Sequence, residues 1–149
     1  MCAPYGATAA VEGAGGRAGQ DGRMSRTSIS APGAAAVGPY SHGVVGDGHV
    51  FLSGQTPLDP TTGRLVDGDI GAQTRQCFAN LGAVLAAGGL TFDDVLKCNV
   101  YLTDMDDFAA MNAVYAEHFE EPYPARTTIG VAALPLGASV EIELVARTR

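Results

Sequence analysis

A long helical pattern followed directly by a strand pattern constrains the fold of this chain more than any other feature. Asp69 is a suitable N-cap for a helix, and Gly88-Gly89 would end that helix at about Ala87. Between them, apolar residues recur at the three- and four-residue spacing of a helix with one buried face: Ile70, Cys77, Phe78, Leu81, Val84 and Leu85. Such a helix needs a partner layer to cover.

The following segment, residues 95–102, predicts a strand of that partner layer. Its alternation places four apolar residues on one face: Leu96, Cys98, Val100 and Leu102. Before the helix, residues 44–53 form a hairpin pattern around Gly46-Asp47-Gly48-His49. A second helix is expected after Asp104, and its buried stripe would be Phe108, Met111, Tyr115 and Phe119.

Two final strands, residues 127–131 and 140–145, complete the pattern. Strands, helix, strand, helix and strands in this order predict a two-layer α+β domain. Two helices cover only one face of the sheet, yet the final strands supply apolar residues for both sides. We therefore expect a closed oligomer, which would bury the face that the helices leave open.

The chain is expected to divide into a tail, residues 1–28, and one domain, residues 29–149. The tail contains six Gly and six Ala, with Val11 as almost its only aliphatic residue, so it cannot bury a core and is predicted to be disordered. Met24 would be a natural start for a compact domain. Residues 1–23 are therefore open to two interpretations, a genuine extension or an artefact of the assigned start.

Charge and composition exclude several classes of protein. The net charge is −7, and the tail contributes +1 (three Arg against Glu12 and Asp21), so the domain carries −8. An acidic domain without a basic stripe is a poor match for nucleic acid. No apolar run is long enough for a membrane span, and the N-terminus lacks the basic and apolar regions of a secretory signal, so a cytoplasmic protein is expected.

The histidines and cysteines do not suggest a metal site or a disulfide framework. His42, His49 and His118 have no ligand-like spacing with one another or with the cysteines. Three widely spaced cysteines, Cys2, Cys77 and Cys98, favour a reducing compartment. Cys77 and Cys98 fall on apolar stripes, where we expect them to be packing residues.

The candidate chemistry lies in the last third of the domain. Arg126 stands at the mouth of a predicted strand, and its guanidinium can bind a carboxylate through two parallel hydrogen bonds. Glu141 and Glu143 share the strand face opposite Val140 and Ile142, and a carboxylate there can orient or deprotonate a water. The alternatives are an arginine paired with a surface acid and two solvated glutamates.

Short motifs throughout residues 30–147 resemble the reactive-intermediate deaminases, the RidA/YjgF family. The matching stretches are Gly38-Pro39-Tyr40, Ser53-Gly54-Gln55, Asp59-Pro60 with Thr62-Gly63, Asp104-Met105-Asp106-Asp107-Phe108, Pro124-Ala125-Arg126, Leu134-Pro135 and Val140-Glu141-Ile142-Glu143. The resemblance implies the chorismate-mutase-like RidA fold and a homotrimer with active sites in the clefts between subunits. It also implies a hydrolase that converts 2-iminobutanoate and 2-iminopropanoate to 2-oxo acids and ammonia without a cofactor or metal.

The resemblance assigns roles to individual residues. Arg126 would bind the substrate carboxylate and Glu141 would be the catalytic carboxylate, which leaves Glu143 a structural role. Tyr40 would line the pocket and hydrogen-bond the substrate, and Ser53 would lie close by. Without the resemblance, an equally good interpretation of Tyr40 is a tyrosine packed in the core, and Ser53 is simply a serine at the end of a strand. Many members have a cysteine where this chain has Thr128, whose backbone can still offer hydrogen bonds to a substrate.

Two other functions stay open. The chain could be a ligand-binding or regulatory trimer that keeps the cleft without turnover, or an RNA-cleaving inhibitor of translation. The net charge argues against RNA. A binding module would keep Arg126 but tolerate the loss of Glu141, so the presence of both residues favours an enzyme.

Overall fold

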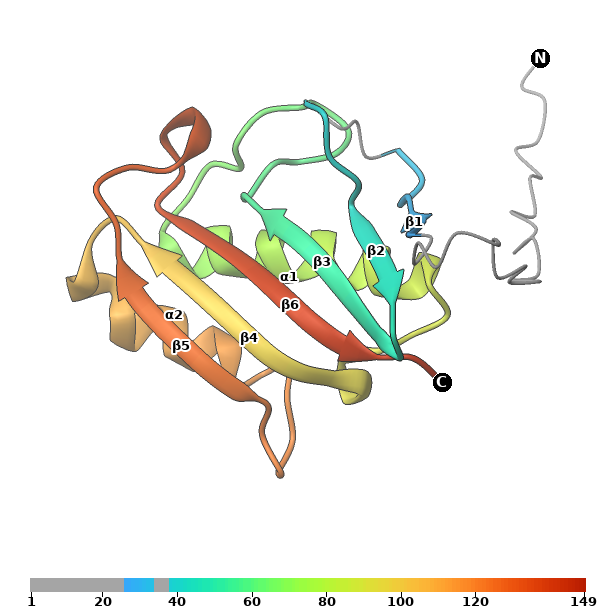
Figure 1. Ribbon diagram of the computed structural model, residues 1–149. Coiled ribbons are helices and arrows are strands. Elements are labelled where there is room, and N and C mark those ends of the chain that lie inside the picture. The colour runs from blue at the N-terminus through green and yellow to red at the C-terminus, as the bar shows by residue number, and fades with distance from the viewer. Residues whose placement is uncertain (1–25, 34–37) are drawn as a thin grey trace, which may run out of the picture.

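The computed structural model describes residues 26–33 and 38–149, in which six strands form one sheet and two helices cover one of its faces (Figure 1). The elements follow the chain as β1 (Thr27–Ile29), β2 (Gly43–Gly46), β3 (His49–Gln55), α1 (Ile70–Ala87), β4 (Val95–Leu102), α2 (Phe108–Tyr115), β5 (Ala125–Gly130) and β6 (Val140–Arg147). Short 3₁₀ turns lie at Phe92–Asp94, Met105–Asp107 and Pro135–Gly137. The predicted two-layer α+β architecture is confirmed.

The strand order is β1-β2-β3-β6-β4-β5. Only β4 and β5 are parallel among these pairs, because α2 carries the chain from the end of one strand back to the start of the other. The last strand, β6, lies between β3 and β4 in the middle of the sheet. This position matters for function, because β6 carries both candidate glutamates.

Local signals in the sequence correctly predicted the hairpin and the first helix. Asp47 and Gly48 both adopt positive φ, 49° and 74°, which is the geometry of a two-residue turn matched to the twist of β2 and β3. The Asp69 side chain accepts a hydrogen bond from the Ala72 amide at 2.9 Å and caps α1. The helix ends at Gly88, as expected.

The prediction for Leu96 is wrong. Leu96 is 45 % exposed, whereas its neighbour Val95 is only 7 % exposed. Along β6, Val95 pairs with Ala146 and Lys97 with the adjacent Val145, so β4 carries one extra residue at this point. At such a bulge the alternation of buried and exposed side chains is interrupted, which leaves Leu96 exposed. Beyond the bulge the alternation holds, and Cys98, Val100 and Leu102 are buried as predicted.

Two further expectations need correction. Phe108 is 36 % exposed and is not part of a buried stripe, although Met111 and Tyr115 are buried as predicted and Phe119 is buried beyond the end of the helix. The sheet also begins earlier than the expected boundary at residue 29, because Thr27 pairs with Val45 in β1. Residues 1–25 of the predicted tail lie outside the described residues.

The core lies between the sheet and the helices. Alternate residues of β6 point into it, and all are at most 2 % exposed: Val140, Ile142, Leu144 and Ala146. Cys77 and Cys98 are completely buried there, which confirms them as packing residues, and burial raises the pKa of both thiols. On the open face, Phe51 and Ile129 remain about half exposed, at 51 % and 45 %.

An ion pair between a buried carboxylate and two largely exposed arginines lies at the end of β6. The Asp94 carboxylate is fully buried and accepts hydrogen bonds from Arg149 Nε at 3.0 and 3.1 Å and from the Thr91 amide at 3.0 Å. Arg147 lies 3.5 Å away. The Arg149 hydrogen bond is the main reason why the pKa of Asp94 is lowered, with smaller contributions from Thr91 and Arg147.

We therefore expect Asp94→Asn to lower the free energy of unfolding at pH 7 by about 2 kcal/mol, because hydrogen bonds to a charged partner are lost. The lowered pKa means that this stabilisation is present above the unfolded-state pKa of about 4 and is lost as the pH falls below it. Urea denaturation across this range measures the difference. Exposed Asp93→Asn is the control and should change little. A loss that does not shrink in acid would assign the effect to packing rather than to charge.

Candidate active site

Glu141 lies on the open face of the sheet, in a groove of about 430 Å³. Tyr40, Ser53, Gly54 and Leu136 also line this groove, so it is built from three separate segments of the chain. The side chain is half-buried. Burial is the main cause, and the neighbouring Glu143 the second, of the raised pKa of Glu141. Within the described residues the Glu141 carboxylate has no hydrogen-bond donor. A carboxylate of raised basicity with free lone pairs is suited to accepting a proton.

Gly54 makes room for that carboxylate. A Cβ at this position would overlap Oε1 of Glu141, so any larger residue would force the carboxylate to move from where it lies. The pairing of β3 with β6 is irregular between Leu52 and Gln55, which is where the glycine lies. A glycine inside a strand pattern is a signal for such a close approach, but Gly54 was not among the predicted site residues.

Ser53 holds the segment that leads to Tyr40. Its hydroxyl donates to the Ser41 carbonyl at 2.6 Å, and its amide donates to the His42 carbonyl at 2.9 Å. Tyr40 itself is 48 % exposed, so it is not a core tyrosine, and its ring meets that of His42 edge-on. The groove therefore gathers Tyr40, Ser53 and Glu141, three of the residues predicted from the sequence.

Glu143 differs from Glu141 in its contacts. Its Oε1 accepts hydrogen bonds from Asn99 Nδ2 at 2.9 Å and from the Tyr101 hydroxyl at 2.6 Å. The Tyr101 bond is the main cause that raises the pKa of Tyr101 to about 12. Catalysis by Glu141 rather than Glu143 stays a prediction, and it gains support because Glu143 is already held by two neighbours.

Arg126 lies on the opposite face of the sheet, against α2. Its Nη1 donates to Asn112 Oδ1 at 2.7 Å, and its guanidinium carbon stands 4.5 Å above the Tyr115 ring and 5.6 Å from that of Phe108. Among the described residues, no carboxylate forms an ion pair with Arg126. The surface ion pair considered as the alternative is therefore not found there. Stacking on aromatic rings fixes the guanidinium while leaving its remaining N–H groups available.

Thr128 shares this face with Arg126. The two residues pair with Val100 and Cys98 of β4, both of which point into the core. The Thr128 hydroxyl is buried and has no hydrogen-bond partner within residues 26–33 and 38–149. Asn112 was not predicted from the sequence, and together with Arg126, Tyr115 and Thr128 it makes up what we call the Arg126 cluster. Nothing in its local sequence marks it, because its importance comes from the contact with Arg126.

One chain does not bring Arg126 and Glu141 together. Along β4, Arg126 pairs with Cys98, whereas Glu141 pairs with Tyr101, three residues further on. Three residues along a strand span about 10 Å, and β5 and β6 are two strand spacings apart, which is also about 10 Å. The Cα atoms of Arg126 and Glu141 are therefore roughly 14 Å apart, and their side chains lie on opposite faces of the sheet. A substrate of a few heavy atoms cannot touch both within one chain.

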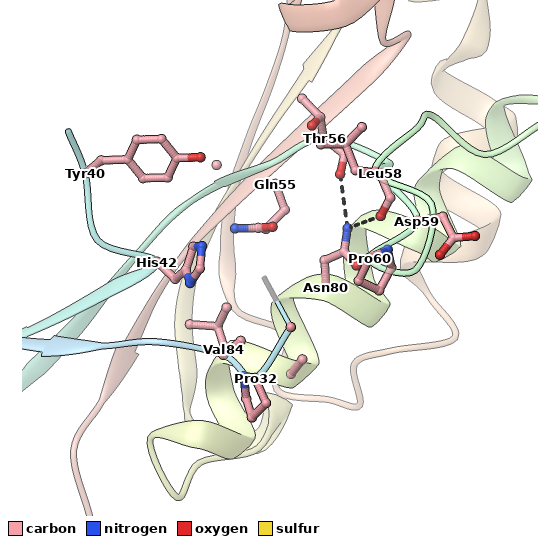
Figure 2. A pocket seen from close by; sticks show the side chains of 15 residues that line it. Pro32, Tyr40, His42, Gln55, Thr56, Leu58, Asp59, Pro60, Asn80 and Val84 are labelled. Atoms are coloured by element: carbon pink, nitrogen blue, oxygen red, sulfur yellow. Dashed lines mark hydrogen bonds between the residues drawn. The ribbon is translucent and has the colours of Figure 1, made fainter. Parts of the chain in front are cut away.

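A second cavity, of about 210 Å³, lies on the helix side of Tyr40 (Figure 2). Its wall includes the Asn80 amide, which donates to the carbonyls of Thr56 and Leu58 at 3.2 and 2.9 Å. Thr56, Leu58 and Gly54 also line the Glu141 groove. Asn80 of α1 thus anchors the loop that forms one side of that groove.

None of the helices in the described ranges combines the length and apolar character that a membrane span requires. In the same part of the chain, no three histidine, cysteine, aspartate or glutamate side chains are grouped so that they could hold a metal ion.

The chain is similar to several known proteins in sequence and in fold. Residues 28–148 match the family model described as endoribonuclease L-PSP. The chain is 45 % identical over 112 residues to the goat (Capra hircus) protein named 2-iminobutanoate/2-iminopropanoate deaminase, covering 75 % of this chain and 82 % of that one.

Two solved structures are also similar. The structure of RidA from an Antarctic Psychrobacter species has 46 % sequence identity and a TM-score of 0.78, covering 82 % of this chain and 99 % of that one. The structure of E. coli TdcF with bound serine has 38 % identity and a TM-score of 0.77, covering 83 % and 99 %.

Proposed function

The chain belongs to the endoribonuclease L-PSP family, which includes the RidA proteins, and we propose that it hydrolyses 2-imino acids to 2-oxo acids and ammonia. The observation that carries this proposal is the state of Arg126, a half-buried guanidinium stacked on Tyr115 with no carboxylate partner among the described residues. Such a group is prepared to bind the carboxylate of a substrate. The similar goat protein is named for this activity on 2-iminobutanoate and 2-iminopropanoate.

The active site would be completed by a second copy of the chain. Each subunit would contribute its Glu141 groove to one neighbour and its Arg126 cluster to the other, which is a head-to-tail contact that closes into a ring. The open sheet face, with Phe51 and Ile129 exposed, supplies apolar surface for such contacts. A homotrimer, which the family resemblance implies, would contain three of these sites.

In the proposed reaction, Arg126 holds the substrate carboxylate and Glu141 orients a water toward the imine carbon. The water oxygen bonds to that carbon as the C=N pair moves to nitrogen. Glu141 takes a proton from the water and passes it to nitrogen, which gives a carbinolamine. The carbinolamine hydroxyl then loses its proton through Glu141 to nitrogen, the C–N bond breaks, and ammonia and the 2-oxo acid leave. The residues need to supply only positioning and proton transfer.

The serine bound to the similar TdcF structure supports a substrate of this size. Serine and a 2-imino acid both carry a nitrogen and a carboxylate on the same α-carbon. Their anionic carboxylate also explains the need for Arg126, because a domain of charge −8 repels anions at long range and requires a local cation to bind one.

RNA cleavage is the second candidate, because the matching family model is described as an endoribonuclease. The acidic domain weakens it, since binding to a phosphate backbone depends on clustered Lys and Arg. A purely ligand-binding trimer is the third candidate. It would need Arg126 but would place no demand on the basicity of Glu141.

A coupled assay separates the three candidates. Threonine dehydratase generates 2-iminobutanoate in the presence of semicarbazide, and the protein should increase 2-oxobutanoate at the expense of the trapped imine. The Arg126→Lys variant tests the role of Arg126, because lysine keeps the positive charge but lacks the planar guanidinium that binds a carboxylate through two hydrogen bonds. Most of the activity should disappear in this variant, while the mass of the oligomer is unchanged. If wild-type protein left the partition unaltered, imine hydrolysis would be rejected. Cleavage of RNA under the same conditions would then favour the second candidate.

A further inference from the structure

Leu136 adopts a backbone conformation that leucine rarely takes. Its φ and ψ are 61° and 12°, and Gly137 after it also has a positive φ of 77°. In the left-handed region the Cβ of an L-residue crowds its own backbone, so glycine and asparagine are the usual occupants. Leucine at this position therefore destabilises the turn between β5 and β6 relative to either of them.

The Leu136 side chain does not offset this strain by packing in the core. It is 67 % exposed, more than any other large apolar side chain at the described surface. An exposed leucine alone would need no explanation, but exposure and strain at the same residue are both unfavourable. A contact that the isolated chain lacks would account for both.

Leu136 lines the same groove as Glu141. Ser53 and Glu141 form the polar part of that groove, and Leu58, Pro135 and Leu136 form its apolar rim. A 2-imino acid bound with its reacting carbon at Glu141 has one group left to accommodate, the side chain on that carbon. The apolar rim is the surface of matching chemistry.

We propose that Leu136 is a specificity-determining residue that packs against the side chain of the 2-imino acid and favours long aliphatic side chains over short ones. This inference rests on the proposed imine hydrolysis. Selection of this kind is moderate, because a few methylene contacts in a partly open apolar site discriminate by factors of about ten to one hundred.

Three substitutions separate the Leu136 side chain from its backbone. Leu136→Asn and Leu136→Gly remove the apolar contact and relieve the strain, whereas Leu136→Ala removes the contact but keeps the strain. All three should lower the ratio of kcat/KM for a long aliphatic imine over 2-iminopropanoate, by about tenfold. Because Leu136→Asn and Leu136→Gly relieve the strain, both variants should have a higher thermal unfolding midpoint than Leu136→Ala. An amino-acid oxidase with catalase generates the imines from norleucine and alanine, and semicarbazide trapping measures their hydrolysis.

Leu96→Ala is the matched control, because Leu96 is also exposed but lies at the β4 bulge and does not line the groove. Its substrate ratio should equal that of wild type. An unchanged ratio in the three Leu136 variants, with wild-type protein active, would overturn the inference and leave the proposed function standing. Loss of the oligomer in these variants would also overturn it, by assigning Leu136 to a subunit contact. Wild-type protein inactive on every imine would overturn the proposed function and this inference with it.

Discussion

Glu141→Gln is expected to lower imine hydrolysis by on the order of 10²–10⁴-fold, while Glu143→Gln costs far less activity. Glutamine preserves the shape of Glu141 beside Gly54 but removes the charge and the basicity that the water proton requires. Glu143 already accepts hydrogen bonds from Asn99 and Tyr101, which a glutamine oxygen can still accept. The two glutamates share one face of β6, so each variant is a matched control for the other.

The pH dependence provides a second readout of the same prediction. Burial raises the pKa of Glu141, so its protonated form persists to a higher pH than in an ordinary glutamate. Activity should therefore fall as the pH drops through that raised pKa, because protonated Glu141 cannot accept the water proton. Glu143→Gln should keep this acid limb and Glu141→Gln should lose it.

Coupled imine-hydrolysis rates and thermal unfolding, measured together, distinguish catalysis from stability. Equal, small losses of rate in both variants would remove general-base catalysis from the mechanism and leave Arg126 as a binding residue only. The reverse order, with Glu143→Gln the more damaging, would transfer the catalytic role to Glu143.

The parts of the fold that depend on local chemistry were predictable from the sequence. The Asp69 cap, the stop at Gly88 and the Asp47-Gly48 turn each rest on a few neighbouring residues, and the structure confirms all three. Leu96 was misplaced because a bulge depends on the partner strand. The extra residue in β4 becomes visible only against β6, nearly fifty residues later in the chain.

The candidate site shows the same division. Motifs identified Arg126, Glu141, Tyr40 and Ser53, and three of these line one groove. The face on which Arg126 lies depends on its pairing with Cys98, so alternation within a short edge strand does not reveal it. Asn112 was missed for a related reason. An asparagine in a helix carries no signal until the neighbouring strand places a guanidinium within 2.7 Å of it.

The separation of Arg126 from Glu141 leads to the most direct test of a shared site. Arg126→Ala and Glu141→Gln proteins should each be nearly inactive, yet their mixture, denatured and refolded together, should recover about a quarter of the wild-type activity. A site formed between two subunits is intact when the arginine comes from a Glu141→Gln chain and the glutamate from an Arg126→Ala chain. In a random equal mixture, the chance that the arginine comes from a Glu141→Gln chain is about one half, and so is the chance that the glutamate comes from an Arg126→Ala chain. Both are true at about one site in four, which gives the expected fraction of activity.

The control for this experiment replaces one component with the double variant. A mixture of Glu141→Gln with Arg126→Ala/Glu141→Gln contains no intact glutamate and should recover nothing, although mixed oligomers should form in the same way. Light scattering gives the number of subunits in the oligomer, and mass spectrometry shows whether it contains both variants. Mixed oligomers without recovered activity would contradict a site shared between subunits. Because the two side chains point away from opposite faces of one sheet, that outcome would also rule out a reaction in which Arg126 and Glu141 act on the same substrate molecule.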